Sequence, residues 1–238
     1  MKNIDDFLEK VKNRKILFVY PHPDDESVMA GGLIQRALAK KFQVTVLTLT
    51  EGSRGKIHIN GKGRSVTEIR RDEMAGAMSR LGVADWVMWK FEDGKLRKYK
   101  KWRVRLRKFI EETEPGVVVT YDLSGVTGHP DHIALSLEIL RIFKKTKGFR
   151  LLWTSFEEKS RLVSFAVTKY LIGPRYRLDL SWEEAKNKWL AAYAHKSQGL
   201  VGYLGLPWWV LVFTSRKEWY SEAKIDRKYK YRFTKFKI

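Results

Sequence analysis

The chain has 238 residues, of which 44% are hydrophobic, and it carries a formal net charge of +20 with no cysteine. This length and composition support one large domain with a buried core. The absence of cysteine excludes disulfides, thiolate catalysis and cysteine-ligated zinc, so a bound metal ion would have to use histidine and carboxylate ligands.

Short apolar runs alternate with amphipathic stretches over the first two-thirds of the chain, a pattern typical of βαβ units. The predicted strands are 15–20, 43–50, 84–90 and 116–121, and the predicted helices are 27–41, 66–81, 95–113 and 132–145. Residues 51–65 form a glycine-rich loop. The sequence therefore predicts an α/β, Rossmann-like fold, with a mostly parallel sheet flanked by helices.

The domain organisation that we expect is one α/β domain over residues 1–200. A small C-terminal extension, 201–238, would add a strand and a basic tail packed on the same domain. Residues 200–214 are apolar and predict a core strand followed by a packed loop, with a membrane-facing or subunit-facing patch as the alternative. No signal-peptide core and no apolar run of about 18 residues is present, which predicts a cytoplasmic protein.

Two polar clusters each follow a predicted strand. Residues 21–26 (PHPDDE) come after the first strand, and residues 128–132 (GHPDH) come after the fourth. Ligands bind beyond the carboxyl ends of the strands in such sheets, so we expect the clusters to meet at one edge. Alone, each could be a solvated loop or a set of helix-capping residues. Together they supply the three His and carboxylate ligands of a catalytic zinc and leave groups for proton transfer.

The combined pattern resembles the LmbE-like (PIG-L) N-acetylglucosamine deacetylase family over most of the chain. Five short motifs carry the resemblance: HPDDE at 22–26, the T-x-G-x-x-G loop at 50–55, R-x-x-E at 70–73 with Leu-Gly at 81–82, HPDH at 129–132 and H-x-S-Q at 195–198. The resemblance implies a zinc-dependent hydrolase that removes the acetyl group from an N-acetylated amino sugar. The alternatives are a metal-dependent hydrolase of another amide or of a phosphate ester, and a non-catalytic protein that binds polyanions or lipid.

Carried over by position, the resemblance implies that His22, Asp25 and His132 bind Zn²⁺. Asp24, next to the ligand Asp25, would be the general base that takes a proton from the water. The remaining open coordination position would hold that water, as in other catalytic zinc sites.

Four further residues are assigned in the same way. His129 would stabilise the developing oxyanion or protonate the leaving amine, and Asp131 would orient an imidazole or stabilise its charge. Arg70 would contact the substrate through a sugar hydroxyl, although an Arg-x-x-Glu pair is also an ordinary surface ion pair. His195 would be a second substrate-binding residue, with a helix-end histidine as the alternative.

The positive charge is concentrated between residues 95 and 108, which hold nine Lys or Arg and no acidic residue. A solvated helix with one apolar face explains this stretch, and contact with anionic lipid headgroups or polyanions is the alternative. The expected partner is therefore a soluble N-acetylated oligosaccharide or an anionic glycolipid, with peripheral contact to an anionic membrane. A homo-oligomer is plausible, no specific nucleic acid is expected, and the abundance of Lys, Arg and Glu predicts a thermophilic source.

Overall fold

The computed structural model describes residues 1–54, 63–156, 172–198 and 207–224. The strands are β1 Lys2–Asn3, β2 Lys15–Tyr20, β3 Gln43–Thr50, β4 Asp85–Phe91, β5 Val117–Tyr121, β6 Arg150–Ser155, β7 Tyr176–Asp179 and β8 Lys217–Glu222. The helices are α1 Ile4–Glu9, α2 Asp25–Ala39, α3 Val66–Leu81, α4 Lys101–Thr113, α5 Gly125–Gly128, α6 Pro130–Thr146, α7 Trp182–Ala194 and α9 Trp208–Thr214, with a short 3-10 helix, η3, at Lys196–Gln198.

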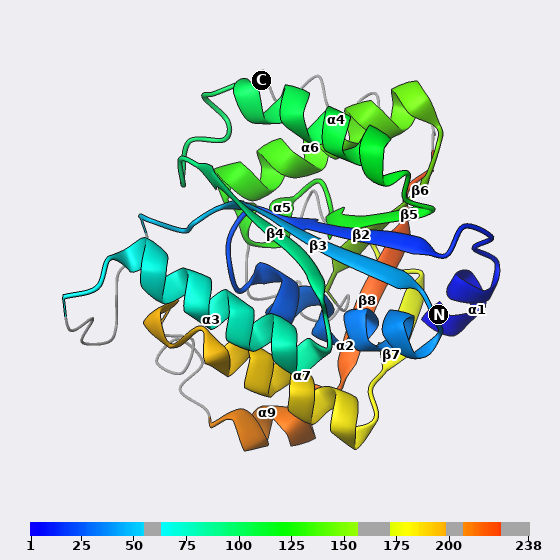
Figure 1. The fold of residues 1–238 in the computed structure, drawn as a ribbon. Coiled ribbons are helices and arrows are strands. Elements are labelled where there is room, and N and C mark those ends of the chain that lie inside the picture. Colours follow the sequence, from blue (N-terminus) through cyan, green and yellow to red (C-terminus); the bar gives the residue numbers. More distant parts are fainter. Residues whose placement is uncertain (55–62, 157–171, 199–206, 225–238) are drawn as a thin grey trace.

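The strands of the described residues form one eight-stranded sheet in the order β1-β7-β8-β6-β5-β2-β3-β4. Strands β2 to β6 are parallel to their neighbours in this set, and β8 runs antiparallel to β6 and β7. Helices α2, α3 and α7 lie on one face, and α4 and α6 lie on the other (Figure 1). The predicted α/β fold with a mostly parallel, helix-flanked sheet is confirmed.

The strand order also locates the functional edge of the sheet. The chain runs outward from β2 through β3 to β4, and then returns to β5 on the other side of β2. The carboxyl ends of β2 and β5 therefore form a topological switch point, where open α/β sheets bind ligands. Both strands are apolar over most of their length because helices cover both of their faces.

The predicted helix 95–113 is too long at its start, because α4 begins at Lys101. Two backbone N–H groups of the preceding segment, those of Gly94 and Leu96, donate to the carboxylate of Asp131. The indole N–H of Trp102 donates to the carbonyl of Leu96 at 2.8 Å. These bonds hold residues 94–96 outside the helix. Trp102, Leu106 and Ile110 form the buried apolar face of α4, as expected.

The predicted core strand in residues 200–214 is wrong in its described part. Residues Trp208–Thr214 form helix α9, which follows Pro207 and buries Leu211 and Val212. The C-terminal strand instead lies at β8, immediately after this helix. Residues 200–206 and the tail from 225 lie outside the described residues, so the proposed domain boundary stays a prediction. Among the described helices, none is both long and apolar enough to cross a bilayer.

Candidate active site

The first part of the site is the turn between β2 and α2. His22 lies in this turn, and Asp25 is the first residue of α2. The backbone N–H of His22 donates to Oδ2 of Asp25 at 3.0 Å, which closes the turn. Asp24 stands between them with a φ of 112°, a value that non-glycine residues rarely adopt. Such strain is typical of functional sites, where the surroundings hold an unfavourable backbone in place.

The second part of the site is the connection from β5 to α6. His129 is the N-cap of α6, Pro130 occupies its first turn, and His132 follows on the same turn. Gly125 has a φ of 64°, and a Cβ at this position would press against His132 at 2.8 Å. Val126 also has a positive φ, 61°, which is an outlier for a β-branched residue. The backbone is therefore constrained where it delivers the two histidines.

The two turns bring three potential ligand atoms together. Nδ1 of His22 lies 3.4 Å from Oδ2 of Asp25 and 3.3 Å from Nε2 of His132, and the last two atoms are 3.6 Å apart. Four ligands around an ion at about 2.0–2.2 Å in tetrahedral geometry are separated by about 3.3–3.6 Å. The three atoms therefore have the spacing of one face of such a site. His129 lies close enough to His22 and His132 to be a further potential ligand.

The protonation of His132 suits a metal ligand. Its Nδ1 lies 2.9 Å from the carbonyl oxygen of Gly125, which can only accept, so the proton is on Nδ1 and the lone pair of Nε2 faces the other ligands. Burial lowers the pKa of His132 and favours this neutral form. The ring stacks on Tyr121 with centroids 4.2 Å apart. Neutral imidazole is the form that binds metal ions.

Tyr121 is a site residue that the sequence analysis missed. It ends β5, and its hydroxyl donates to Oδ1 of Asp25 at 2.5 Å, which leaves Oδ2 directed at the histidines. Burial opposes ionisation of Asp25, but its electrostatic interactions with His132 and His22 and the bond from Tyr121 lower its pKa below the usual range. The only available signal was its place at the carboxyl end of a strand.

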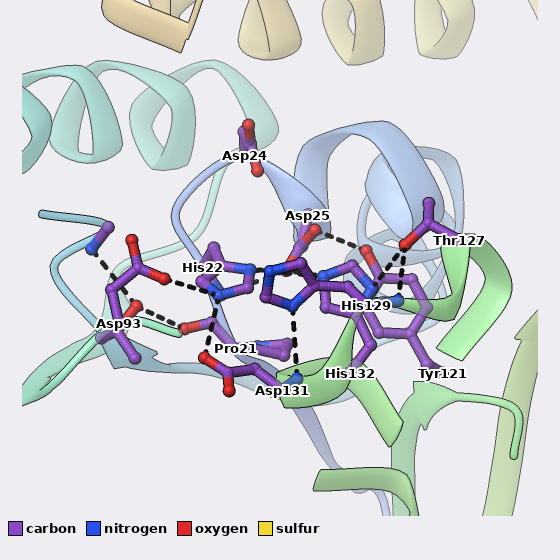
Figure 2. A network of polar contacts seen from close by, with 12 residues as sticks. Pro21, His22, Asp24, Asp25, Asp93, Tyr121, Thr127, His129, Asp131 and His132 are labelled. Atoms are coloured by element: carbon purple, nitrogen blue, oxygen red, sulfur yellow. Dashed lines mark hydrogen bonds and ion pairs between the residues drawn. The ribbon is translucent and has the colours of Figure 1, made fainter. Parts of the chain in front are cut away.

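His22 is in contact with carboxylates at both ring nitrogens. Nε2 lies 3.1 Å from Oδ1 of Asp93 and 3.4 Å from Oδ2 of Asp131, opposite the edge that faces Asp25. Burial would lower the pKa of His22, but these carboxylates raise it well above its usual value. The imidazole that Asp131 contacts is that of His22 (Figure 2), and its role in orienting the ring stays a prediction.

Asp93 was also missed by the sequence analysis. It follows β4 by two residues, and its Oδ2 accepts the backbone N–H of Arg54 at 3.0 Å. Burial alone would raise the pKa of Asp93, but the bond and the charge of His22 lower it to about 2. A carboxylate after the end of the third predicted strand was a usable signal, because the other two clusters have the same position relative to their strands.

Two groups are left for proton transfer. Asp24 stands apart from the network of the other residues (Figure 2), and burial together with the charge of Asp25 raises its pKa to about 7. Nδ1 of His129 accepts the backbone N–H of Asp131 at 3.2 Å, so the proton of the neutral ring is on Nε2. Burial, and then the charge of His22, lower the pKa of His129.

A cleft of about 540 Å³ opens onto this cluster. The described residues that line it are His22, Asp24, Asp25, Arg54, Arg70, Asp93, Gly94, His129 and Gln198. The volume lies within the range of small-molecule sites. Because most of the lining side chains are charged or polar, the cleft suits a hydrophilic ligand.

Of the two predicted substrate-binding residues, only Arg70 lines this cleft. His195 is fully buried, and its Nε2 faces Oε1 of Glu26 at 3.4 Å, so its position does not support substrate contact. Gln198, three residues later, lines the cleft instead. The segment is tied to α3 because the N–H and the hydroxyl of Ser197 both donate to Glu73 at 2.7 Å.

Comparison with known proteins agrees with this arrangement. Residues 17–143 match the family described as GlcNAc-PI de-N-acetylase, PIG-L. The deacetylase of 1D-myo-inositol 2-acetamido-2-deoxy-alpha-D-glucopyranoside from Thermobispora bispora is 32% identical over 61% of this chain and 52% of its own length. The enzyme of the same description from Geodermatophilus obscurus is 29% identical, over 74% of this chain and 61% of its own length. The chain thus spans roughly half to three-fifths of these relatives.

Solved structures show the same fold. The N,N'-diacetylchitobiose deacetylase from Pyrococcus horikoshii matches with a TM-score of 0.68 and 19% identity, over 92% of this chain and 90% of that chain. The conserved protein TT1542 from Thermus thermophilus matches with a TM-score of 0.60 and 25% identity, over 80% and 82%.

The fold and the site define an α/β protein with a His and carboxylate cluster at the switch point of its sheet. Within that class, the match over more than half of its length shows that the chain belongs to the PIG-L (LmbE-like) family.

Proposed function

We propose that this protein is a zinc-dependent deacetylase that hydrolyses the acetamide of an N-acetylglucosamine-containing compound. The observation that carries the proposal is the spacing of Nδ1 of His22, Oδ2 of Asp25 and Nε2 of His132, which matches one face of a tetrahedral zinc site. Zinc fits this ligand set because it accepts imidazole and carboxylate ligands and leaves one position open in catalytic sites. The curated relatives that act on an acetamido sugar support the substrate class.

Bound zinc supplies Lewis acidity, which polarises the amide carbonyl and lowers the pKa of water to about 7. The protein residues supply the proton transfers. Asp24 lines the cleft, and its carboxylate takes the proton from the attacking water, for which a pKa of about 7 is well matched. His129 lines the same cleft. Its Nδ1 accepts the N–H of Asp131, so the proton of the neutral ring is on Nε2. This Nε2–H donates to the developing oxyanion or to the leaving nitrogen.

The substrate class follows from the cleft and from the relatives. A polar cleft of about 540 Å³ accommodates a sugar with one further ring. Gln198, on its wall, is suited to bind hydroxyl groups of such a substrate. Arg70 also lines the cleft, but its side chain is buried and its guanidinium donates to the carbonyl of Gly52, so its contact with the substrate stays a prediction. An N-acetylglucosamine linked to inositol or to a second sugar is therefore the expected substrate. Peripheral contact with an anionic membrane and self-association stay predictions.

The first experiment measures acetate and free amine released from N-acetylglucosamine, from its disaccharide and from N-acetylglucosaminyl-inositol. The zinc-loaded protein should release both products from at least one compound, and Asp24→Asn should reduce the rate by about 10²–10⁴-fold because the base is lost. Asp72→Asn is the matched control, since the exposed carboxylate of Asp72 pairs only with Arg64 among the described residues. Release that is equal in Asp24→Asn and in the control would refute the role of Asp24, and no release from any compound would refute the substrate class.

A further inference from the structure

The position of a metal-binding histidine depends on what holds the ring nitrogen that does not bind the metal. Second partners of this kind fix the ring orientation and the tautomer. His22 has such contacts at Nε2, where Asp93 lies at 3.1 Å and Asp131 at 3.4 Å. The longer contact has hydrogen-bond geometry, and the shorter one is an ion pair.

The two carboxylates are held by one short segment of backbone. Asp131 accepts the N–H groups of Gly94 and Leu96, at 2.7 and 3.0 Å. Asp93 belongs to the same segment, which connects β4 to α4. Its other oxygen accepts the N–H of Arg54, from the loop after β3. Each carboxylate is therefore fixed by backbone donors, and neither can turn away from His22 without losing them.

Gly94 constrains the backbone of this segment through its conformation. Gly94 has a φ of 73°, a conformation that favours glycine. A Cβ at this position would lie 2.7 Å from the guanidinium of Arg54. The side chain of Arg54 therefore packs against Gly94, while the N–H of Arg54 bonds the carboxylate of Asp93.

We propose that Asp93 is a positioning residue that acts through His22. Together with Asp131 it keeps the proton of His22 on Nε2 and directs the lone pair of Nδ1 at the metal position, and so raises the affinity for the metal ion. This inference rests on the metal site of the proposed function. The β4–α4 connection contains none of the sequence motifs, and this inference gives it a role in building the metal site.

The test is the zinc affinity of metal-free protein, measured by competition with a chromophoric chelator. Asp93→Asn removes the charge and keeps an oxygen for the N–H of Arg54, so the protein should fold and should bind zinc about 10- to 100-fold more weakly. Asp93→Glu keeps the charge but displaces it, so its zinc affinity should lie between those of the parent protein and Asp93→Asn. Asp85→Asn is the matched control at the start of β4, where the carboxylate of Asp85 accepts the hydroxyl of Thr45 at the opposite end of the sheet. This control variant should leave the zinc affinity unchanged.

The spectrum of the cobalt-substituted protein separates positioning from general damage. Asp93→Asn should keep one cobalt ion per chain and a tetrahedral-type absorption, because the ligands themselves remain. An affinity equal to that of Asp85→Asn would overturn the positioning role alone. Two ions in the parental chain and one in Asp93→Asn would overturn it in favour of a second metal site at His22, Asp93 and Asp131. A parental chain that binds no zinc would instead refute the metal site of the proposed function.

Discussion

Two buried groups of charged side chains lie against the sheet, and they differ in how their acceptors are matched with donors. Glu218, on β8, faces α2, and each of its two oxygens accepts two bonds. Oε1 accepts the N–H of Gly32 at 2.8 Å and Nζ of Lys188 at 2.7 Å, and Oε2 accepts the N–H of Leu33 at 2.9 Å and the hydroxyl of Tyr220 at 2.5 Å. All four acceptor positions of this carboxylate are filled.

The group at the switch point is different. Nδ1 of His22 and Nε2 of His132 face each other at 3.3 Å and both face Oδ2 of Asp25, although the other edge of each ring already has a protein partner. Two imidazole nitrogens and a carboxylate oxygen that converge on one point suit a shared cation. A buried network whose donors and acceptors match holds the fold together, whereas one with converging acceptors is prepared for a ligand.

The largest effect should come from removing a converging acceptor. His132→Phe keeps an aromatic ring against Tyr121 but removes the ligand nitrogen. Lewis acidity lowers the barrier by several kcal/mol, so its loss should reduce acetate release by about 10³-fold or more. The free energy of unfolding of the metal-free protein should fall by only about 1 kcal/mol, for the lost bond to Gly125. Zinc titration and urea unfolding test both parts, and a variant that still binds zinc as the parent does would contradict the ligand assignment.

A substitution in the network around Glu218 should instead lower stability and leave zinc binding unchanged. Glu218→Gln leaves Lys188 buried without a counter-charge from that residue, which should lower the free energy of unfolding by about 3–5 kcal/mol. Zinc affinity of the folded fraction should stay unchanged, because the network lies under α2, away from the ligand atoms. Adding Lys188→Met should recover part of the loss, since no buried charge then remains. A loss below about 1 kcal/mol in urea unfolding would show that the network is not structural.

The same contrast explains what the sequence could predict. The two clusters 21–26 and 128–132 were predicted to meet because the order of strands and helices was readable from apolar periodicity, and strand ends converge in parallel sheets. The structure places them together as expected. By contrast, the partners of Glu218 come from α2, α7 and β8, which are far apart in sequence. No local pattern marks such a network.

Single site residues at strand ends also could not be predicted from the sequence. Tyr121 and Asp93 stand alone, outside any motif, and only the fold shows that they contact Asp25 and His22. His195 belongs to a motif, yet it turns inward to Glu26, because a motif gives the residue type but not the direction of the side chain. The helix expected from residue 95 begins later because Asp131 takes two backbone donors from the segment before it.

Asp24 is placed for function at a cost in stability. Burial and the charge of Asp25 raise its pKa to about 7, above the value of an unfolded chain. The stability associated with its protonated form is therefore present at acidic pH and is lost as the pH rises toward and through 7. Asp24→Asn cannot ionise, so the metal-free variant should melt at a higher temperature than the parent near pH 8. The two should melt alike near pH 3, below the pKa of about 3.9 of an unfolded aspartate, where Asp24 is mostly neutral in both states. Melting curves of metal-free protein at both pH values measure this. An equal difference in melting temperature at the two pH values would show that the substitution acts through packing or the strained backbone of this turn. A difference confined to high pH would show that the proposed base is held where its charged form is disfavoured, before any metal is bound.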